Sequence, residues 1–201
     1  MKIMAFVGSP RKGSNVDILI DKVIEGAQSK TEVEAEKIYL YEADIKNCNA
    51  CGLHTPLRGS KDCPIKDDME GIQKRIVDAD AFIFGSPNHG HTISSAMTNF
   101  LARIMPLVKM EAIRDDTGKI VGGKSHSLIK GKKAVIVVSQ GDFSPSASAL
   151  VLRVLTSNLI DFELRKVGEV FSTGNLEKAQ VKDKPEDLKQ AFAKGVRLAE
   201  A

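Results

Sequence analysis

Residues 8–15 bring together glycine, hydroxyl, amide and basic side chains, and they read Gly-Ser-Pro-Arg-Lys-Gly-Ser-Asn. A loop of this composition directly before a helix is suited to binding an anion, because backbone N–H groups and the positive end of the helix dipole meet there. The segment therefore predicts a phosphate site. The side chains that would serve it are those of Ser9, Arg11, Lys12, Ser14 and Asn15.

The kind of phosphate site is narrowed by two motifs that the loop does not match. Gly8 and Gly13 have the spacing of a Walker A loop, but Ser14 stands where that motif needs its lysine. The Gly-x-Gly-x-x-Gly fingerprint of dinucleotide sites does not occur here either. A loop for a single terminal phosphate remains, as in flavin mononucleotide (FMN). The alternative is an ordinary turn in which Ser14 or Asn15 caps the helix.

The elements around this loop alternate between strands and helices. Apolar runs that end in polar loops predict strands at 1–7, 33–40, 79–84, 133–138 and 162–170. Helical periodicity predicts helices at 16–24, 68–77, 93–104, 145–159 and 185–198. This alternation predicts an α/β fold, a flavodoxin-like three-layer sandwich with a five-stranded parallel sheet in the order 2-1-3-4-5 and helices on both faces.

In that order, the loops after strands 1, 3 and 4 lie side by side at the carboxyl edge of the sheet, where such sheets bind ligands. A flavin would place its phosphate on the first loop and its ring against the other two. The second loop would contribute Pro87, Asn88 and Gly90, and the third would contribute Ser139, Gln140 and Gly141.

Composition limits the class of protein. The 201 residues support one domain, and a hydrophobic fraction of 42% is enough for a core. A net charge of +3 without a basic stripe argues against nucleic-acid partners, and no apolar run approaches the ~20 residues that span a membrane. Because the chain enters a strand at once, we expect no signal peptide and a cytoplasmic location. The long connections at 41–66 and 105–132 are expected to be functional or mobile, the second as a lid, an oligomer contact or a disordered excursion.

Several ordered motifs together resemble the NADPH-dependent FMN reductase family, and most closely its iron–sulfur flavoprotein branch. The resemblance rests on segments quoted in chain order: Gly8-Ser9-Pro10-Arg11, Ser14-Asn15, Asp67-Asp68-Met69, Phe84-Gly85-Ser86-Pro87, Ile93-Ser94, Met97, Asn99-Phe100 and Arg103. It implies bound FMN, NAD(P)H as co-substrate, and a homodimer or homotetramer with flavins near subunit interfaces. It also implies that the first loop holds the phosphate and that His89 occupies an aromatic position beside the ring.

The cysteines depart from that branch, which carries four of them in the connection after strand 2. This chain has Cys48, Cys51 and Cys63, and His54 stands at the spacing of the missing one. The three thiolates, with or without the histidine, could hold an iron–sulfur cluster or a zinc ion. The alternatives are a dithiol or plain structural residues without metal.

Other polar residues have simpler interpretations. His89 and His91 flank a glycine, but no carboxylate or cysteine near them in sequence completes a metal site. Asp67 and Asp68 are interpreted as a helix cap and Arg103 as an ion-pair or subunit-contact residue. Ser94, Ser95 and Asn99 are expected to cap and pack the helix that they open, and His54 and His126 to be solvated.

These observations favour an FMN-dependent oxidoreductase that passes electrons from NAD(P)H to a quinone, a flavin or another small acceptor, with no acid–base residue required. The main alternative is a non-enzymatic electron carrier that exchanges electrons with a ferredoxin-type protein. A third hypothesis is a phosphate-binding regulatory domain without redox chemistry.

Overall fold

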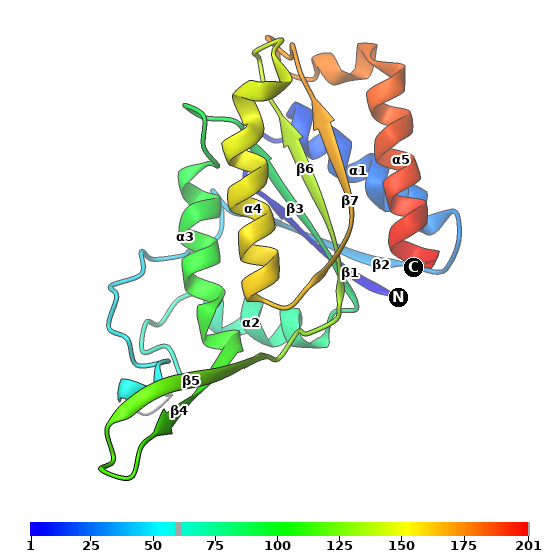
Figure 1. The fold of residues 1–201 in the computed structure, drawn as a ribbon. Coiled ribbons are helices and arrows are strands. Elements are labelled where there is room, and N and C mark those ends of the chain that lie inside the picture. Colours follow the sequence, from blue (N-terminus) through cyan, green and yellow to red (C-terminus); the bar gives the residue numbers. More distant parts are fainter. Residues whose placement is uncertain (59–61, 201) are drawn as a thin grey trace.

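A computed structural model describes residues 1–58 and 62–200 of the chain (Figure 1). Residues 59–61, which belong to the predicted connection at 41–66, and residue 201 lie outside the described residues. The five predicted strands and the five predicted helices are all present, with ends that shift by a few residues.

Five parallel strands form the central sheet, in the order β2-β1-β3-β6-β7. Their bounds are Lys2–Val7 (β1), Glu34–Tyr39 (β2), Ala81–Pro87 (β3), Lys133–Ser139 (β6) and Arg165–Ser172 (β7). When only the strands of this sheet are counted, the order is 2-1-3-4-5, that of a flavodoxin-like fold. The predicted strand numbers differ from these labels because the prediction did not include β4 (Val108–Arg114) and β5 (Ile120–Ser127), the two strands of a separate hairpin.

Burial explains the sequences of the strands. The inner strands β1, β3 and β6 are almost continuously apolar and buried, as expected where helices cover both faces of a parallel sheet. The edge strand β2 instead carries Glu34, Glu36 and Lys37, and these charges discourage pairing with another strand.

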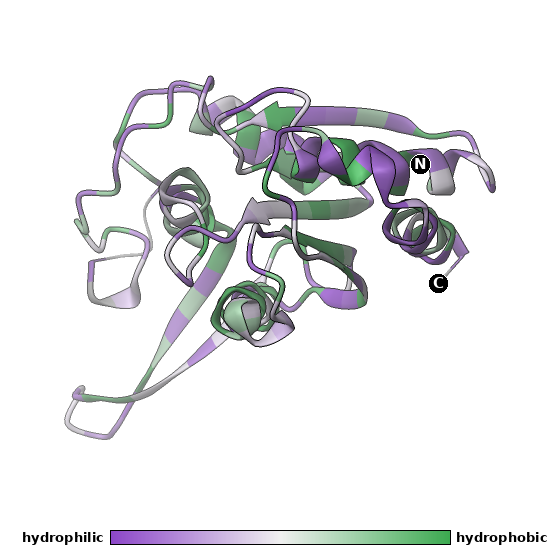
Figure 2. Ribbon diagram, turned by 90° about the horizontal axis from the view of Figure 1, so that it is seen from above, coloured by the Kyte–Doolittle hydropathy of each residue, from purple (hydrophilic) through white to green (hydrophobic). Residues whose placement is uncertain are grey.

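Two helical layers enclose the sheet. The helices α1 (Asn15–Gln28) and α5 (Pro185–Glu200) cover one face, and α2 (Met69–Asp78), α3 (Ser95–Ile104) and α4 (Ala149–Asp161) cover the other. Seen from the carboxyl edge in Figure 2, the hydrophobic strands lie between the helices of the two layers. On the second face, Phe6 packs against Phe100 with ring centroids 4.4 Å apart.

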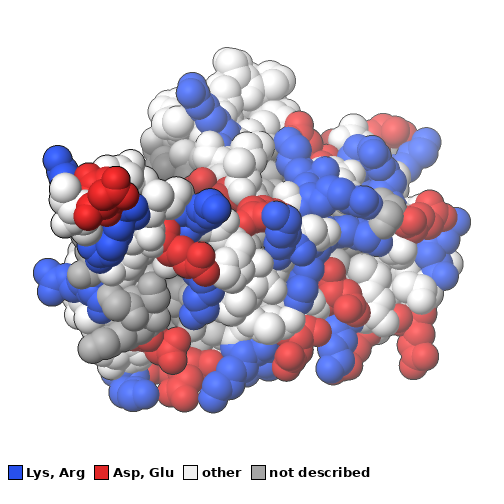
Figure 3. Space-filling model, turned by 60° about the horizontal axis from the view of Figure 1, so that its bottom comes forward, with Lys and Arg blue, Asp and Glu red and all other residues white. Residues whose placement is uncertain are grey.

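Within residues 1–58 and 62–200, four short 3-10 turns lie at Pro56–Arg58, Met105–Leu107, Pro145–Ser148 and Gln180–Asp183. The helix predicted at 145–159 is therefore two elements, a 3-10 turn followed by α4. None of the described helices combines the length and the apolar character needed to cross a membrane. On the face shown in Figure 3, basic side chains lie beside acidic ones.

The predicted connection at 105–132 contains an antiparallel hairpin, β4 (Val108–Arg114) and β5 (Ile120–Ser127). Its turn is closed by Asp115, whose carboxylate accepts from the N–H groups of Thr117 and Lys119, while Gly118 has a φ of +82°. The hairpin projects from the end of the body opposite the carboxyl edge of the sheet (Figure 1). It therefore does not cover the loops of the predicted site in its own chain.

Candidate functional site

A pocket of about 130 Å³ lies at the carboxyl edge of the sheet, between the loops that follow β1, β3 and β6. Of the residues predicted to hold the cofactor, all but Lys12 and Gly90 line it. The complete lining is Ser9, Arg11, Ser14, Asn15, Val16, Pro87, Asn88, His89, Ser139, Gln140, Gly141 and Asn175.

Close packing of β1 against β3 fixes the first loop. The N–H group of Gly8 donates to the carbonyl of Gly85 at 2.7 Å, and a Cβ on Gly8 would lie 2.8 Å from that oxygen. Gly13 has a φ of +65°, and its N–H group donates to Asp17 at 2.7 Å. Ser14 caps α1 by accepting from the Asp17 N–H group at 3.3 Å. The helix cap that the alternative interpretation assigned to Ser14 or Asn15 is therefore present at Ser14, and the start of α1 faces the pocket.

The two basic residues of this loop differ in their surroundings. The Lys12 ammonium pairs with Glu42 at 2.8 Å and lies over the ring of Tyr39, so its charge is directed away from the pocket. Hydrogen bonding and Coulomb attraction from Glu42 raise the pKa of Lys12. The Arg11 guanidinium has no hydrogen-bond or ion-pair partner within residues 1–58 and 62–200, and Arg11 lines the pocket. Arg11 is therefore available to an anionic ligand.

Asp17, the one acid in the first turn of α1, is buried but compensated. Its carboxylate accepts from Lys37 at 2.8 Å and from the Tyr39 hydroxyl. Burial alone lowers the pKa of Lys37, but hydrogen bonds to Asp17, Asp21 and Tyr39 outweigh it, and the net shift is upward. The charge of Lys37 beside the buried carboxylate reduces its repulsion of an anion at the helix start.

The second and third loops are joined through the Asn88 amide. The N–H group of Asn88 donates to the Ser139 carbonyl at 2.9 Å, and its Nδ2 donates to Oε1 of Gln140 at 3.0 Å. The Nε2 of Gln140 donates to the Ser144 carbonyl at 2.7 Å, and Ser148 also donates to Oε1 of Gln140. Gln140 is buried, so its side chain holds the loops in place.

A tight turn follows Asn88. The backbones of His89 and Thr92 exchange hydrogen bonds, and Gly90 and His91 between them have φ values of +58° and +64°. Gly90 thus shapes the turn without lining the pocket. Nδ1 of His91 lies 3.1 Å from the Ala147 carbonyl, while His89 is exposed at the pocket rim.

Asn175, in the loop after β7, lines the pocket and was not predicted. Its Nδ2 donates to the hydroxyls of Ser139 and Ser172 at 3.0 and 2.7 Å. The rule that ligands bind at the carboxyl ends of parallel strands also applies to the strand predicted at 162–170. Applied to the residues that follow it, that rule would have found Asn175.

Two buried amide oxygens around the pocket have no hydrogen-bond donor in the described structure, namely Oδ1 of Asn88 and Oδ1 of Asn175. An unpaired buried acceptor is costly, so each is expected to meet a donor from a ligand or from water. FMN combines an anionic phosphate with hydroxyl and ring N–H donors. The unpaired cation of Arg11, the start of α1 and the two free acceptors are therefore the groups that such a ligand requires.

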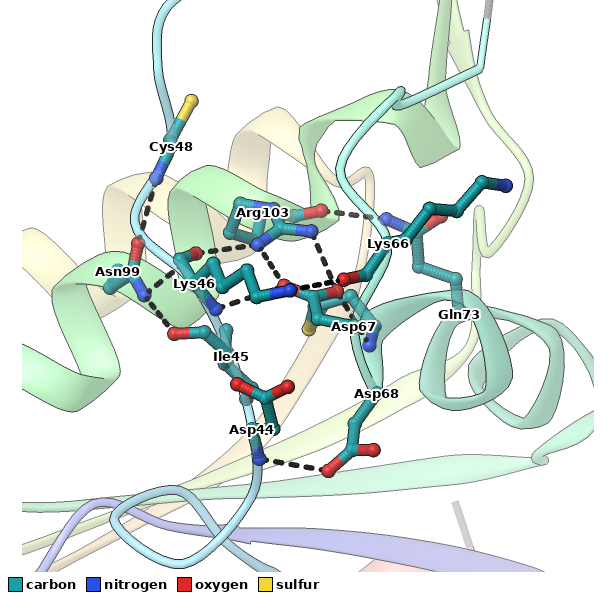
Figure 4. Close-up of polar contacts among 11 residues, drawn as sticks. Asp44, Ile45, Lys46, Cys48, Lys66, Asp67, Asp68, Gln73, Asn99 and Arg103 are labelled. Carbon is teal, nitrogen blue, oxygen red and sulfur yellow. Dashed lines mark hydrogen bonds and ion pairs between the residues drawn. The ribbon is translucent and has the colours of Figure 1, made fainter.

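The connection that carries the cysteines is anchored on α3 (Figure 4). Asn99 accepts from the Cys48 N–H group at 3.2 Å and donates to the Ile45 carbonyl at 3.1 Å. One turn later, Arg103 donates to the Lys46 carbonyl and to both oxygens of Asp67. The Cys48 side chain points away from this network in Figure 4. The ion pair predicted for Arg103 is confirmed, whereas the Asn99 side chain anchors the cysteine connection instead of capping its own helix.

The predicted cap on α2 is only partly correct. The Asp68 side chain makes no cap hydrogen bond and instead accepts from the Asp44 N–H group at 2.8 Å. Asp67 accepts from the Met69 N–H group at 3.1 Å. The carboxylate of Asp67, one residue before Asp68, can also reach the start of α2. The sequence alone does not show which of the two aspartates forms the cap.

Cys48, Cys51, Cys63 and His54 line one small cavity of about 30 Å³ beside Arg103. The three thiols are free, and within the described residues no three His, Cys, Asp or Glu side chains are grouped as metal ligands. With three thiols arranged in this way, the loop does not fit a four-thiolate cluster. The metal role of the cysteines stays a prediction.

Comparison with known proteins places these observations in context. The family model described as NADPH-dependent FMN reductase matches residues 1–161. An iron–sulfur flavoprotein of Archaeoglobus fulgidus is 27% identical over 202 residues, which cover 100% of this chain and 80% of the relative. An iron–sulfur flavoprotein of Methanocaldococcus jannaschii is 29% identical over 121 residues, which cover 60% of this chain and 61% of the relative.

Solved structures share the fold at low sequence identity. An NAD(P)H:quinone oxidoreductase from Methanothermobacter marburgensis superposes with a TM-score of 0.73 at 17% identity, covering 98% of each chain. An FMN-dependent NADH-azoreductase from Bacillus anthracis, solved in complex with FMN, superposes with a TM-score of 0.71 at 14% identity, covering 99% of each chain.

Proposed function

This chain belongs to the NADPH-dependent FMN reductase family, and we propose that its redox chemistry takes place at the pocket lined by Arg11, Asn88 and Asn175. Membership assigns FMN as cofactor and NAD(P)H as co-substrate. The residues that hold the cofactor and the electron acceptor are our proposal. We propose a quinone, a free flavin or another small molecule as acceptor.

The proposal rests chiefly on one observation. Three groups that have no partner among the described residues surround the same pocket: the guanidinium of Arg11 and the Oδ1 atoms of Asn88 and Asn175. The cation and the start of α1 would bind the phosphate. The free oxygens would accept hydrogen bonds from the ribityl hydroxyls or the ring N–H group.

Bound FMN would supply the hydride and electron transfer, and the protein would supply position and electrostatics. Backbone donors at 139–141 are proposed to offset negative charge at the edge of the reduced ring, as an oxyanion hole does. Gln140 would act as a positioning residue, because its buried amide already ties the loops together. His89, exposed at the rim, is placed to contact the ring or the acceptor.

The experiment is to titrate FMN into the apoprotein and then to follow NADPH oxidation with a soluble quinone. We expect binding of FMN, seen as quenching of its fluorescence, and turnover that depends on the quinone. Protein that ignores added FMN would overturn the cofactor site and favour the regulatory-domain hypothesis. FMN-loaded protein without turnover would favour an electron carrier.

A second candidate is an electron-transfer flavoprotein that exchanges electrons with a ferredoxin-type partner. It is favoured by the similarity to relatives named iron–sulfur flavoproteins. Iron and acid-labile sulfide in anaerobically purified protein would support it. Bound zinc, or no metal at all, would leave FMN as the redox centre.

We further propose that the protein is a homodimer or homotetramer and acts in the cytoplasm. Free thiols suit a reducing compartment, and the resemblance to FMN reductases favours flavins near subunit interfaces. Light scattering after gel filtration measures the mass directly, and a mass near 21.8 kDa would contradict the assembly.

A further inference from the structure

A segment from the C-terminal part of the chain lies against the phosphate loop. It follows β7 and runs through Asn175 to the 3-10 turn Gln180–Asp183. Ala179, which precedes that turn, has a φ of +64°. The family model matches residues 1–161, so this segment lies outside the matched range.

Asn15 holds this segment in place. Its Nδ2 donates to the Glu177 carbonyl at 2.9 Å, and its Oδ1 accepts from the Val181 N–H group at 3.0 Å. Asn15 is buried, and both polar atoms of its amide already have backbone partners. We therefore assign Asn15 a positioning role for this segment, beside the phosphate contact that the family resemblance implies.

Lys178 lies between these two anchored positions. Its Cε atom is 3.7 Å from the site that a Cβ on Gly13 would occupy, so its side chain lies over the phosphate loop. Lys178 is exposed, and it has no ion-pair or hydrogen-bond partner in the described part of the chain. Lys178 is not among the residues that line the pocket, so its unpaired ammonium would have to turn from its place over the loop to reach a phosphate bound there.

We propose that Lys178 is the second phosphate-binding cation, together with Arg11, and that Lys12 does not serve this role. The inference rests on the proposed FMN site. It follows from three contacts: Lys12 pairs with Glu42, Asn15 fixes the segment at 177–181, and Lys178 covers Gly13. A phosphate at the start of α1 would then lie between two cations from opposite ends of the sequence.

The test compares FMN with riboflavin, which lacks the phosphate, in titrations of the apoprotein. For Lys178→Met we expect the Kd for FMN to rise about tenfold, the scale of one charged hydrogen bond, and the Kd for riboflavin to stay constant. The FMN affinity of Lys178→Met should also depend less on salt, because one phosphate cation is gone.

Two further variants make the comparison sharp. Lys182→Met removes an equal charge from the same segment and should leave both affinities as in the wild type. Lys12→Met separates the two assignments, since only a phosphate-binding Lys12 would raise the ratio of the FMN Kd to the riboflavin Kd. An unchanged ratio in Lys178→Met, or a loss of FMN affinity confined to Lys12→Met, would overturn the inference.

Wild-type titrations keep this inference separate from the proposed function. If the wild type binds FMN and riboflavin equally well, the phosphate site itself is wrong, and the proposed function loses its carrying observation. If the wild type prefers FMN and Lys178→Met keeps that preference, only the assignment of Lys178 fails. Circular dichroism of each variant identifies any loss of affinity that comes from misfolding.

Discussion

Arg103 of α3 forms a bidentate ion pair with the carboxylate of Asp67, with N–O distances of 2.6 and 2.9 Å. The side chain of Arg103 is 1% exposed and that of Asp67 is 0% exposed, so the ion pair is buried. The Nε of Arg103 has no acceptor among the described residues, which leaves Asp67 and the Lys46 carbonyl as its main partners. This pair ties both ends of the cysteine connection to one helix (Figure 4).

Asp67→Asn should destabilise the fold strongly, because it leaves the buried guanidinium without its counter-charge. Removing one partner of a buried ion pair costs about 3–5 kcal/mol of unfolding free energy. Urea unfolding followed by circular dichroism measures the change. Glu36→Gln is the matched control, since it breaks the exposed pair with Arg75 and should cost about 1 kcal/mol or less. Equal effects of the two changes would contradict the special role of the buried pair.

The same pair makes stability depend on pH. Burial alone would raise the pKa of Asp67, but the hydrogen bond from Arg103 and those from two backbone N–H groups outweigh it, and the pKa is lowered. A lowered folded-state pKa contributes stability above the unfolded-state value of about 3.9, and this stability is lost as pH falls through the folded-state pKa. We expect wild-type stability to fall more steeply than that of Asp67→Asn below about pH 4. Parallel pH profiles would exclude Asp67 as the cause.

Much of this architecture is predictable because its signals are local. The buried runs of β1, β3 and β6, each followed by a glycine- or serine-bearing loop, are sufficient to place three loops at one edge. The hairpin also carried a local signal, with alternating polarity before the turn at Asp115–Gly118. It was missed because the segment was interpreted by its length and polarity.

The remaining features depend on contacts between distant residues. Asn15 bonds to Val181, 166 positions away, and no pattern near Asn15 indicates that its amide is already used. Lys12 is a residue type that commonly binds phosphate. The pairing of β2 with β1, however, brings Glu42 close enough to form an ion pair with it. Side-chain function in the phosphate loop therefore becomes clear only when the neighbouring strand and the C-terminal segment are in place.

The close packing of α1 against α5 leaves no room for a side chain at Gly195. A Cβ on Gly195 would lie 1.9 Å from the Val23 carbonyl oxygen, so Gly195→Ala must push the helices apart. Forcing extra atoms into a packed core typically costs about 1–3 kcal/mol, and we expect a loss at the upper end of that range in urea unfolding.

Gly71→Ala in α2 is the matched control for that change. Its Cβ would meet only the flexible end of Arg75 at 3.3 Å, so alanine should stabilise the helix by about 0.4–1 kcal/mol. If Gly195→Ala lowers the free energy of unfolding and Gly71→Ala raises it, the close backbone contact at Gly195, and not the mere presence of a glycine, sets the stability of the α1–α5 pair. A neutral Gly195→Ala would contradict the observed approach of the two helices.

Arg11→Ala should weaken FMN binding without weakening riboflavin binding. Arg11 is the one basic residue of the phosphate loop whose charge is left unpaired by the described residues, because Lys12 pairs with Glu42. Loss of a charged hydrogen bond costs roughly 1.5–3 kcal/mol, or about 10- to 150-fold in Kd, measured by fluorescence titration of the apoprotein. Arg58→Ala, at an exposed position in the cysteine connection, removes an equal charge away from the pocket and should bind FMN like the wild type. If Arg11→Ala binds FMN as tightly as the wild type does, Arg11 does not bind the phosphate.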